Sequence, residues 1–410
     1  MRAVAAVFFC KLCYNARTYV FFWRSLTMKI VHTADWHLGK IVQGIYMTED
    51  QRYILQQFIA QMRAQQPDVI IIAGDLYDRA LPPVEAVQLL NETLDTLINE
   101  LEIPVICVAG NHDSPSRLAF GSELMAKSGY YVAGEYHKEV MRVVLHDEFG
   151  EVHFHLVPFT EPSVVRLAHE DETITTHQAA MAKTIETITS TMDKEARHVL
   201  IGHAFVTKNG EGDEANTSDS ERPLTVGGVA YVDATLFEPF HYTALGHLHK
   251  AHKVGSEKVR YAGTPLKYSL SERLHQKGYY IVELDATGEI AVNKQVFEPR
   301  YDLRQIEGNI EEILQHDRCE DYVFVRLTNE HPVASPMERV RTVYPNAMHV
   351  VREAATAVAN HMTTAKVEEM NDLQLFESFY QEVLGKLPAD ETAALFLQAL
   401  DELEEGGRRA

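Results

Sequence analysis

A chain of 410 residues exceeds what one typical hydrophobic core organises, so two or three domains are expected. The formal net charge of −21 argues against a general polyanion-binding surface, because nonspecific nucleic-acid binding depends on lysine and arginine patches. Four scattered cysteines argue against a disulfide framework, and no apolar stretch reaches the roughly 18 to 20 residues that span a bilayer. A cytoplasmic protein that does not bind a membrane is therefore expected.

Residues 1–27 differ from the rest of the chain in having four basic residues, no acidic residue and many aromatic ones. One interpretation is a targeting segment, but the apolar run at 4–10 lacks a small-residue cleavage site. The other is an upstream extension from a misassigned start codon, because a buried strand begins abruptly at Met28. The second interpretation is preferred, and residues 1–27 are predicted to be a non-native extension.

Continuous apolar segments then alternate with amphipathic ones. The predicted strands are 29–34, 68–73 and 104–109, and the predicted helices are 49–65 and 84–101. Strands that are apolar throughout belong to a sheet that is covered on both faces. In such α/β arrangements, ligands gather in the loops beyond the carboxyl ends of the strands.

A second group of strands follows, and two of its members run directly into histidines, His203 and His247. The predicted strands are 141–146, 152–157, 198–202 and 242–245. Two β-rich halves that face one another across a shared site are therefore expected. The polar segment 207–223 is expected to be a mobile loop, which either borders the substrate cleft or is exposed without a role.

Side chains that can bind metal ions follow five of these strands. The segments are Asp35-Trp-His37, Gly74-Asp75-Leu-Tyr-Asp78, Gly110-Asn111-His112, Gly202-His203 and Gly246-His247-Leu-His249. Carboxylate oxygen suits hard ions such as Mn²⁺ and Mg²⁺, and imidazole shifts the preference toward Mn²⁺, Fe²⁺ and Zn²⁺. Two divalent ions are therefore predicted, with Mn²⁺ expected and Mg²⁺ as the alternative. The seven predicted ligands are Asp35, His37, Asp75, Asn111, His203, His247 and His249.

The expected chemistry is phosphoester hydrolysis. Two ions about 3.5–4 Å apart need a bridging ligand, normally a carboxylate, and Asp75 is the best candidate because it lies in the middle of the set. Water between such ions is activated for in-line attack on phosphorus. His112 adjoins Asn111 and is predicted to act as a general acid that protonates the departing oxygen. Asp78 is predicted to accept a hydrogen bond from His112 and to orient it.

The pattern of predicted elements changes near residue 282. A hairpin is predicted from strands at 279–284 and 290–297, followed by a strand at 322–327 and a helix near 335–343. These elements predict a small separate α/β domain. The predicted boundaries are 28–278 for the first domain and 279–352 for the second.

A polar linker at 353–371 leads to two predicted amphipathic helices within 372–406. Apolar residues recur at helical spacing from Leu373 to Leu384 and again from Leu395 to Leu403. A short helical pair has little surface of its own to cover such a stripe, so docking onto a partner helix is predicted. The alternative is that the pair folds back onto its own chain.

With these residues assembled, the chain resembles the calcineurin-like metallophosphoesterase superfamily. The superfamily motifs D-x-H, GD-x-x-D, GNH-[DE], GH and GH-x-H match residues 35–37, 74–78, 110–113, 202–203 and 246–249. Within it, the chain is similar to the Mre-type nuclease family, in the bacterial branch formed by the D subunits of SbcCD nucleases. Segments 32–39, 218–228 and 261–272 carry this closer likeness. The resemblance implies an α/β (α+β) fold, a four-layer β-sandwich flanked by helices, with a small capping domain and C-terminal helices.

The resemblance also implies a function and partners. It implies a metal-dependent DNA nuclease, a 3′ to 5′ exonuclease on duplexes and an endonuclease on single strands and hairpins, acting in DNA repair and recombination. The partner would be a coiled-coil ATPase of the SbcC type, bound by 372–406, while 279–352 would contact DNA; a dimer of nuclease subunits is expected. One ion would be held by Asp35, His37, Asp75 and His249, and the other by Asp75, Asn111, His203 and His247.

Other functions remain open at this point. Gly74–Arg79 also matches the opening of the protein-phosphatase version of the motif, so a phosphomonoesterase or a cyclic-nucleotide phosphodiesterase is the alternative enzyme. A metal-bound scaffold that anchors a partner is a third hypothesis. No phosphate-cradling Gly-x-x-x-x-Gly-Lys-Ser/Thr loop occurs, so ATP hydrolysis would belong to another chain.

Overall fold

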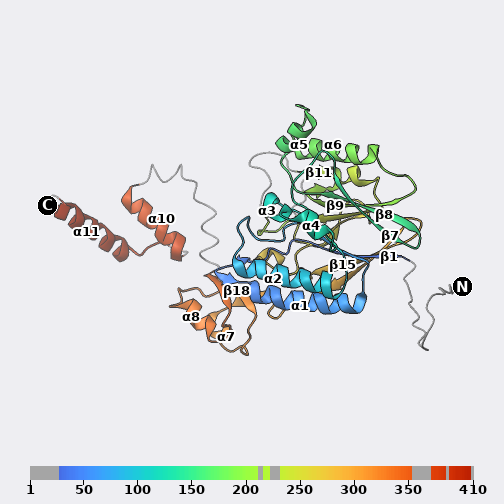
Figure 1. The fold of residues 1–410 in the computed structure, drawn as a ribbon. Coiled ribbons are helices and arrows are strands. Elements are labelled where there is room, and N and C mark those ends of the chain that lie inside the picture. The colour runs from blue at the N-terminus through green and yellow to red at the C-terminus, as the bar shows by residue number, and fades with distance from the viewer. Residues whose placement is uncertain (1–26, 211–215, 222–230, 353–370, 385–386, 408–410) are drawn as a thin grey trace.

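The computed structural model describes residues 27–210, 216–221, 231–352, 371–384 and 387–407. The predicted N-terminal extension and the predicted linker lie outside these residues, except for Thr27 and Asn371. Two six-stranded sheets face one another, and helices cover their outer faces (Figure 1).

The first sheet has the strand order β16-β15-β1-β4-β5-β6. Its parallel part consists of β1 (Met28–Thr33), β4 (Val69–Ala73), β5 (Val105–Val108) and β6 (Tyr130–Ala133). The hairpin of β15 (Gly278–Leu284) and β16 (Ile290–Val296) adds two antiparallel strands beside β1. Every residue of β4 and β5 is buried, which explains why both segments are apolar throughout.

The second sheet has the strand order β13-β14-β12-β9-β8-β7. Its strands are β7 (Met141–Asp147), β8 (Gly150–Val157), β9 (Arg197–His203), β12 (Tyr242–Gly246), β13 (His252–Lys253) and β14 (Val259–Tyr261). The strands β8, β9, β12 and β14 are parallel, and the two outermost strands are antiparallel to their neighbours. The segment predicted as a mobile loop lies between two short strands that pair with each other, β10 (Val206–Thr207) and β11 (Val232–Asp233). Residues 211–215 and 222–223 of this segment lie outside the described part.

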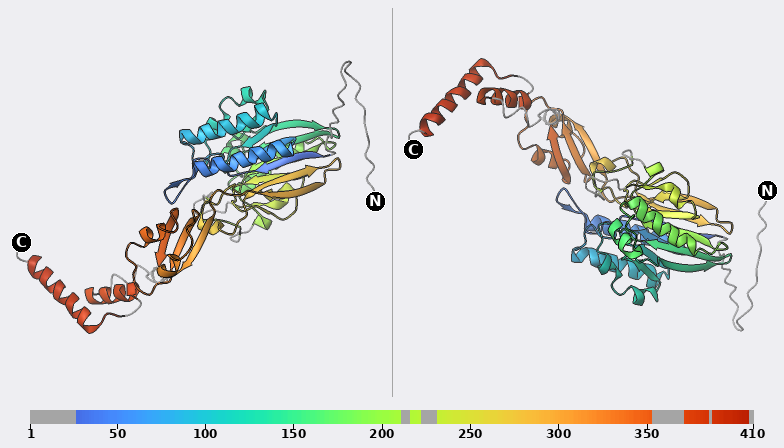
Figure 2. Two further views of the ribbon diagram at one scale, coloured as in Figure 1. Left: turned by 90° about the horizontal axis from the view of Figure 1, so that it is seen from below. Right: turned by 90° about the horizontal axis from the view of Figure 1, so that it is seen from above.

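Alternate residues of the central strands enter different cores, as the two-residue period of a strand requires. On β4, Ile71 packs between the sheets, whereas Ile70 shares a core with helices α1 (Thr48–Gln65) and α2 (Val84–Asp95). On β9, Ile201 lies between the sheets and Leu200 packs with α6 (His177–Ser190). The predicted four-layer α/β architecture is therefore confirmed (Figures 1 and 2).

Short elements complete this sandwich. They are β2 (Ile41–Val42), β3 (Ile45–Tyr46), η1 (Thr96–Glu100), α3 (Pro115–Ala119), α4 (Ser122–Ala126), α5 (Pro162–His169), η2 (Lys208–Gly210), η3 (Ala234–Phe237) and η4 (Leu270–Glu272). The helix predicted at 84–101 is α2 continued by the single π-helical turn η1.

The domain boundary predicted after residue 278 has to move. It assigned β15 and β16 to the small domain, but β15 pairs with β1 in a register that runs from Met28↔Leu284 to His32↔Tyr280. The hairpin therefore extends the first sheet, and the chain leaves the sandwich only after β16. The physical reason is that pairing between strands from opposite ends of a domain leaves no signal in the local sequence.

The small domain has three parallel strands, β17 (Leu303–Gly308), β18 (Tyr322–Leu327) and β19 (Ala347–Arg352), connected by α7 (Ile310–Ile313) and α8 (Pro336–Arg341). On β18, Val323 and Val325 enter this domain's own core, whereas Tyr322 and Phe324 join the core around α1. The Tyr322 hydroxyl also donates a hydrogen bond to Asp50 Oδ2 on α1 (2.6 Å). The small domain is thus packed against the sandwich.

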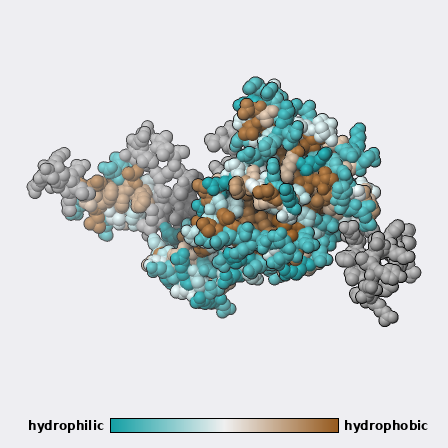
Figure 3. Space-filling model, viewed as in Figure 1, coloured by the Kyte–Doolittle hydropathy of each residue, from teal (hydrophilic) through white to brown (hydrophobic). Residues whose placement is uncertain are grey.

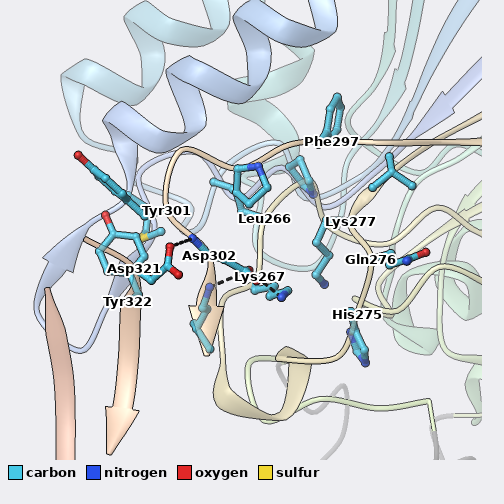
Figure 4. A pocket seen from close by; sticks show the side chains of 15 residues that line it. Leu266, Lys267, His275, Gln276, Lys277, Phe297, Tyr301, Asp302, Asp321 and Tyr322 are labelled. Atoms are coloured by element: carbon cyan, nitrogen blue, oxygen red, sulfur yellow. Dashed lines mark hydrogen bonds and ion pairs between the residues drawn. The ribbon is translucent and has the colours of Figure 1, made fainter. Parts of the chain in front are cut away.

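A cavity of about 340 Å³ lies where the small domain meets the sandwich (Figure 4). Leu266 and Phe297 contribute apolar surface, and two further lining residues, Lys267 and Asp302, form an ion pair with an Nζ–Oδ1 distance of 2.7 Å. Lys277, on the chain leading into β15, lines the same cavity.

The helices α10 (Asp372–Leu384) and α11 (Asp390–Gly407) stand away from the other elements (Figures 1 and 2). Their contact with each other includes the stacked rings of Phe376 and Phe396, whose centroids are 4.0 Å apart. Phe379 and Leu395 are 61% and 67% exposed, so much of the apolar stripe is uncovered. Among the described helices, none combines the length and apolar character needed to cross a membrane.

Candidate metal centre

The predicted site residues come together where strands of both sheets end. Asp35, Asp75 and Asn111 follow β1, β4 and β5, while His203 ends β9 and His247 follows β12. The main-chain N–H of Asp35 donates to Gly74 O (3.0 Å), which holds the turn after β1 beside the turn after β4. A second main-chain N–H, that of His247, donates to Asp35 Oδ1 (2.9 Å) and joins the two sheets at the site.

The backbone at four of these residues lies in the left-handed region. Asp35, His37, Asp75 and His247 have φ values of 53°, 47°, 49° and 111°. Residues other than glycine rarely adopt such angles, and they cluster where surrounding structure holds a functional geometry. The strain is therefore located at the side chains predicted to bind metal.

Two glycines make room for these turns. Gly74 has a φ of 90°, and a Cβ atom there would lie 2.2 Å from His203 Nδ1. A Cβ atom at Gly110 would lie 2.1 Å from Asp75 Oδ1. The φ of Gly110 is not positive, so its backbone conformation does not require glycine. Glycine is required there because the Asp75 side chain approaches so closely.

Asp75 lies between two groups of side chains. Its Oδ2 is 3.7 Å from His37 Nε2 and 3.5 Å from His203 Nε2. Two groups of three residues each have ligand atoms that all lie within 4.8 Å of one another, and Asp75 belongs to both groups. The groups are His37, Asp75 and His112, and Asp35, Asp75 and His203.

The remaining predicted ligands join these groups. His249 Nε2 is 3.1 Å from His37 Nε2. Asn111 Oδ1 lies 2.9 Å from His203 Nε2 and 3.2 Å from His247 Nδ1. All seven predicted ligands therefore lie within one connected cluster.

The donor atoms face one another in a way that suits a cation. His203 Nδ1 must carry the ring hydrogen, because its neighbour Ala73 O (3.0 Å) can only accept. His203 Nε2 therefore directs a lone pair toward the oxygens of Asn111 and Asp75. Among the described residues, buried Asp35 Oδ2 and His37 Nδ1 have no hydrogen-bond partner. Convergent lone pairs and unsatisfied buried atoms fit divalent ions with oxygen and imidazole ligands.

Burial controls the charge of the site. It raises the pKa of Asp35 well above its ordinary value, and the adjacent Asp75 raises this pKa further. Burial lowers the pKa of His203 to about 4 and holds the pKa values of His37 and His247 well below the ordinary value. These imidazoles are thus neutral at pH 7, which is the form that binds metal ions.

The contact predicted between His112 and Asp78 exists, but through the main chain. His112 Nδ1 donates to the carbonyl oxygen of Asp78 (2.7 Å), so the prediction that the Asp78 side chain orients His112 needs correction. The Asp78 carboxylate instead pairs with Lys40 Nζ (2.8 Å). A main-chain contact of this kind cannot be read from residue type. The bond leaves Nε2 of His112 as the nitrogen available to a substrate.

Several buried residues that support the ligands were not predicted. Asp113 accepts hydrogen bonds from the main-chain N–H groups of Leu76, Tyr77 and Gly110 (3.0–3.1 Å), which ties two ligand loops together. Glu272 is fully buried, with Oε1 3.1 Å from His249 Nδ1. Asp113 is the last residue of the matched superfamily motif GNH-[DE], and Glu272 is the last residue of segment 261–272, which carries the likeness to the nuclease family.

Comparisons with known proteins agree with this geometry. A family model described as calcineurin-like phosphoesterase matches residues 28–250, more than half of the chain. A second, described as the type 5 capsule protein repressor C-terminal domain, matches residues 299–383. A solved dimetal phosphatase from Danio rerio aligns with 66% of this chain and 96% of its own at 11% identity, and its TM-score of 0.38 is too low to bear on function.

Two relatives match almost the whole chain, and both are named as the D component of the nuclease SbcCD. The relative from Staphylococcus epidermidis is 35% identical over 382 residues, covering 91% of this chain and 99% of the relative. The relative from Staphylococcus saprophyticus is 36% identical over 364 residues, covering 88% and 94%. With a calcineurin-like domain and relatives of this extent, the chain belongs to the SbcD family of metallophosphoesterases.

Proposed function

We propose that this protein is the nuclease component of an SbcCD-type complex and hydrolyses DNA phosphodiester bonds with two divalent ions, Mn²⁺ being expected. The observation that carries the proposal is the position of Asp75, whose carboxylate belongs to both sets of converging donor atoms. One ligand shared between two ions is what a two-metal phosphoesterase requires.

The ligands divide into two sets around Asp75. His37 and His249 lie on one side of it, and Asn111, His203 and His247 lie on the other. We assign Asp35 to the first set because the family resemblance implies it, although the structure groups its carboxylate with Asp75 and His203. Its Oδ2 atom, which has no partner among the described residues, would be the ligand atom. The ions, when bound, would supply Lewis acidity that activates water and offsets the negative charge of the phosphate.

His112 is proposed to deliver a proton to the departing oxygen. Its Nδ1–H is held by Asp78 O, and its ring meets the ring of His37 edge to face with centroids 4.6 Å apart. Both contacts fix the plane of the imidazole beside the first ligand set. Placing the acid in a fixed position beside the reacting phosphate is the usual requirement for general acid catalysis.

The C-terminal helices are proposed to bind the ATPase partner. The exposed apolar residues of α10 and α11, among them Phe379 and Leu395, suit a partner that offers its own apolar helical face. A partner of this kind also explains how so acidic a chain could act on DNA. With a net charge of −21, the chain needs another protein to contribute much of the DNA affinity. The 3′ to 5′ polarity and the cleavage of single strands and hairpins are proposed from the family resemblance.

Dimerisation is proposed to use the surface over α2, α3 and α4. Figure 3 shows apolar residues gathered there. Phe120 and Leu124 are 83% and 71% exposed, and Leu81 and Val84 are each 66% exposed. A hollow of about 320 Å³ beside them is lined by residues such as Val87 and Met125. Such a patch is unusual for a monomer, and a second copy of the chain would cover it with a matching patch.

The test is Mn²⁺-dependent release of nucleotides from linear duplex DNA, compared with hydrolysis of p-nitrophenyl phosphate. DNA cleavage that exceeds phosphomonoester hydrolysis by several orders of magnitude supports the nuclease. The reverse preference would favour the phosphomonoesterase, and the replacement His112→Gln should abolish either activity. Partner binding and DNA-repair phenotype both unaffected by Asp75→Ala would instead identify a scaffold.

A further inference from the structure

A buried ion pair lies directly behind the predicted ligand His249. Glu272 is fully buried, and its Oε2 is 2.5 Å from Nζ of Lys277, which is 8% exposed. Burying two charges costs several kcal/mol per ion unless the geometry and additional hydrogen bonds compensate. The position of this pair therefore calls for an explanation.

The two charged groups of this pair form hydrogen bonds with His249, a residue of the predicted metal centre, and with residues beside it. Lys277 Nζ donates to Glu272 Oε2, to the main-chain oxygen of His249 (2.8 Å) and to Thr264 Oγ1 (2.7 Å), which uses all three of its N–H groups. Glu272 Oε1 faces His249 Nδ1 at 3.1 Å and also accepts a hydrogen bond from Ser220 Oγ. The pair thus contacts His249 at both its ring and its main chain.

The contact at Nδ1 decides which nitrogen of His249 can bind a metal ion. Nδ1 has two neighbours, Glu272 Oε1 at 3.1 Å and Ser220 Oγ at 2.7 Å. The carboxylate oxygen can only accept, and Ser220 donates its own hydrogen to Glu272 Oε1, so both neighbours accept from Nδ1. Nδ1 therefore carries the hydrogen and Nε2 carries the lone pair. Nε2 is the atom that lies 3.1 Å from His37 Nε2, inside the cluster of predicted ligands. In addition, Glu221 Oε1 accepts from the main-chain N–H of His249 (2.8 Å), so the residue is held on three sides.

We infer that Glu272 is a positioning residue for His249: it fixes the ring tautomer that presents Nε2 to the first metal ion, and Lys277 is its counter-ion. This inference rests on the proposed two-metal function. Outer hydrogen-bond partners of metal-binding histidines orient the ring and raise its basicity, and their loss commonly lowers metal affinity by about 10- to 100-fold. Lys277 also lines the cavity beside the small domain, so the same ion pair adjoins the interface with that domain (Figure 4).

The experiment removes both charges together, which leaves the net charge of the protein unchanged. Mn²⁺ binding is measured by calorimetry and electron paramagnetic resonance on the full-length protein. The wild type should bind two ions, and Glu272→Leu/Lys277→Met should bind one of them about 10- to 100-fold more weakly. Glu272→Gln/Lys277→Met keeps an acceptor for the Nδ1–H of His249 and should lose less Mn²⁺ affinity than Glu272→Leu/Lys277→Met.

The matched control is another well-buried ion pair, Arg197 with Asp147, whose closest N–O distance is 2.6 Å. Arg197 begins β9 and His203 ends it, so this pair lies about 20 Å from the site at roughly 3.3 Å per residue. Asp147→Leu/Arg197→Met should leave both Mn²⁺ affinities unchanged. An equal loss in this control would show that only general destabilisation is being measured, and would overturn the inference.

A second measurement does not depend on any variant folding. Histidine ¹⁵N resonances of the metal-free wild type should show His249 as the Nδ1–H tautomer, and an Nε2–H tautomer would overturn the inference. Unchanged Mn²⁺ affinity in Glu272→Leu/Lys277→Met would also overturn it while leaving the two-metal proposal intact. A wild type that binds fewer than two ions would instead overturn the two-metal proposal, and this inference with it.

Discussion

The side-chain amide of Gln51 on α1 donates a hydrogen bond to the main-chain oxygen of His37 (2.8 Å), and its Oε1 accepts one from the N–H of Gly39 (3.0 Å). One buried amide therefore holds both ends of the turn that carries His37. The Tyr268 hydroxyl, which accepts from Gln51 Nε2 (2.9 Å) and donates to Trp36 O (2.7 Å), closes the network. The strained backbone of this turn is stabilised from the helix that packs behind it.

Replacing Gln51 by Leu should destabilise the protein and weaken metal binding. Two buried main-chain groups lose their partners at about 1–3 kcal/mol each, so a loss of about 2–6 kcal/mol in the free energy of unfolding is expected, measured by urea denaturation. The control is Gln57→Leu, because half-buried Gln57 on the same helix also forms hydrogen bonds with a main chain, that of Glu298, at an exposed position. Mn²⁺ affinity should fall only in the Gln51 variant, and equal effects in both would contradict the proposed support of His37.

Replacing Gly110 by Ala should displace Asp75. The added Cβ would lie 2.1 Å from Asp75 Oδ1 and 2.4 Å from its main-chain nitrogen, so the carboxylate proposed to bridge the two ions has to move. Shifts of about 1 Å at a catalytic group can cost about 100-fold in rate, and a loss of this size or larger in Mn²⁺-dependent DNA cleavage is expected. Gly150→Ala is the control, since its φ of 115° is strained but nothing lies within 4 Å of the added atom. That variant should lose some stability and keep wild-type cleavage.

His32 should make the protein sensitive to acid. Its Nε2–H donates to Leu245 O (3.2 Å) and its Nδ1 accepts from the Tyr242 hydroxyl (2.8 Å), so the ring is neutral. Burial lowers the pKa of His32 to about 3, whereas the unfolded chain has the ordinary value of 6.5. Between these values the unfolded state binds more protons, so the contribution of His32 is complete above pH 6.5 and is lost as the pH falls.

The size of this effect follows from the same two pKa values. Between pH 6.5 and pH 5 the loss attributable to His32 is about 2 kcal/mol, at about 1.4 kcal/mol per pH unit. Urea denaturation of the metal-free protein at pH 7 and pH 5 measures it. The decrease in unfolding free energy should be about 2 kcal/mol smaller in His32→Gln than in the wild type. An identical decrease in both proteins would mean that the His32 ring is not held neutral in the folded state.

The sequence predicts those parts of the fold that depend on local pattern. The buried parallel strands β4 and β5 were predicted because strands covered on both faces are apolar at every position. The site residues were predicted because each follows such a strand, and strands of a parallel sheet deliver their carboxyl ends to one edge. The hairpin of β15 and β16 was misassigned because its membership in the first sheet depends on pairing with β1.

Supporting contacts were harder to predict, for physical reasons that differ between residues. Asp78 orients His112 with a main-chain oxygen, which every residue type possesses. Glu272 and Lys277 are charged residues, and charged residues are usually exposed, so only the structure reveals them as a buried pair behind His249. Sequence pattern locates the ligands of such a site, whereas the contacts that fix their orientation depend on tertiary packing.

The apolar surface on α3 and α4 should be required for dimerisation. Introducing charge with Phe120→Asp/Leu124→Asp places two carboxylates in the proposed interface, so sedimentation velocity should show a monomer where the wild type is a dimer. Leu167→Asp on α5 is the control, since Leu167 is equally exposed at 80% but lies outside this surface. A wild-type monomer, or a dimer that tolerates both charges, would contradict the proposal.

Deleting residues 365–410 should abolish association with the ATPase partner and spare metal-dependent cleavage of single-stranded DNA. The described helices of this region stand apart from the sandwich that carries the metal centre, so their removal leaves the site intact (Figure 1). Gel filtration of the two proteins mixed together measures association.

Phe379→Asp/Leu395→Asp should have the same effect as the deletion, because both side chains belong to the exposed apolar stripe. The polar, exposed Gln381 provides the control replacement Gln381→Asp, which should leave the complex unchanged. A complex retained after the deletion would place the ATPase contact elsewhere on the chain, and loss of DNA cleavage by the deleted protein alone would show that the helices also support the nuclease site.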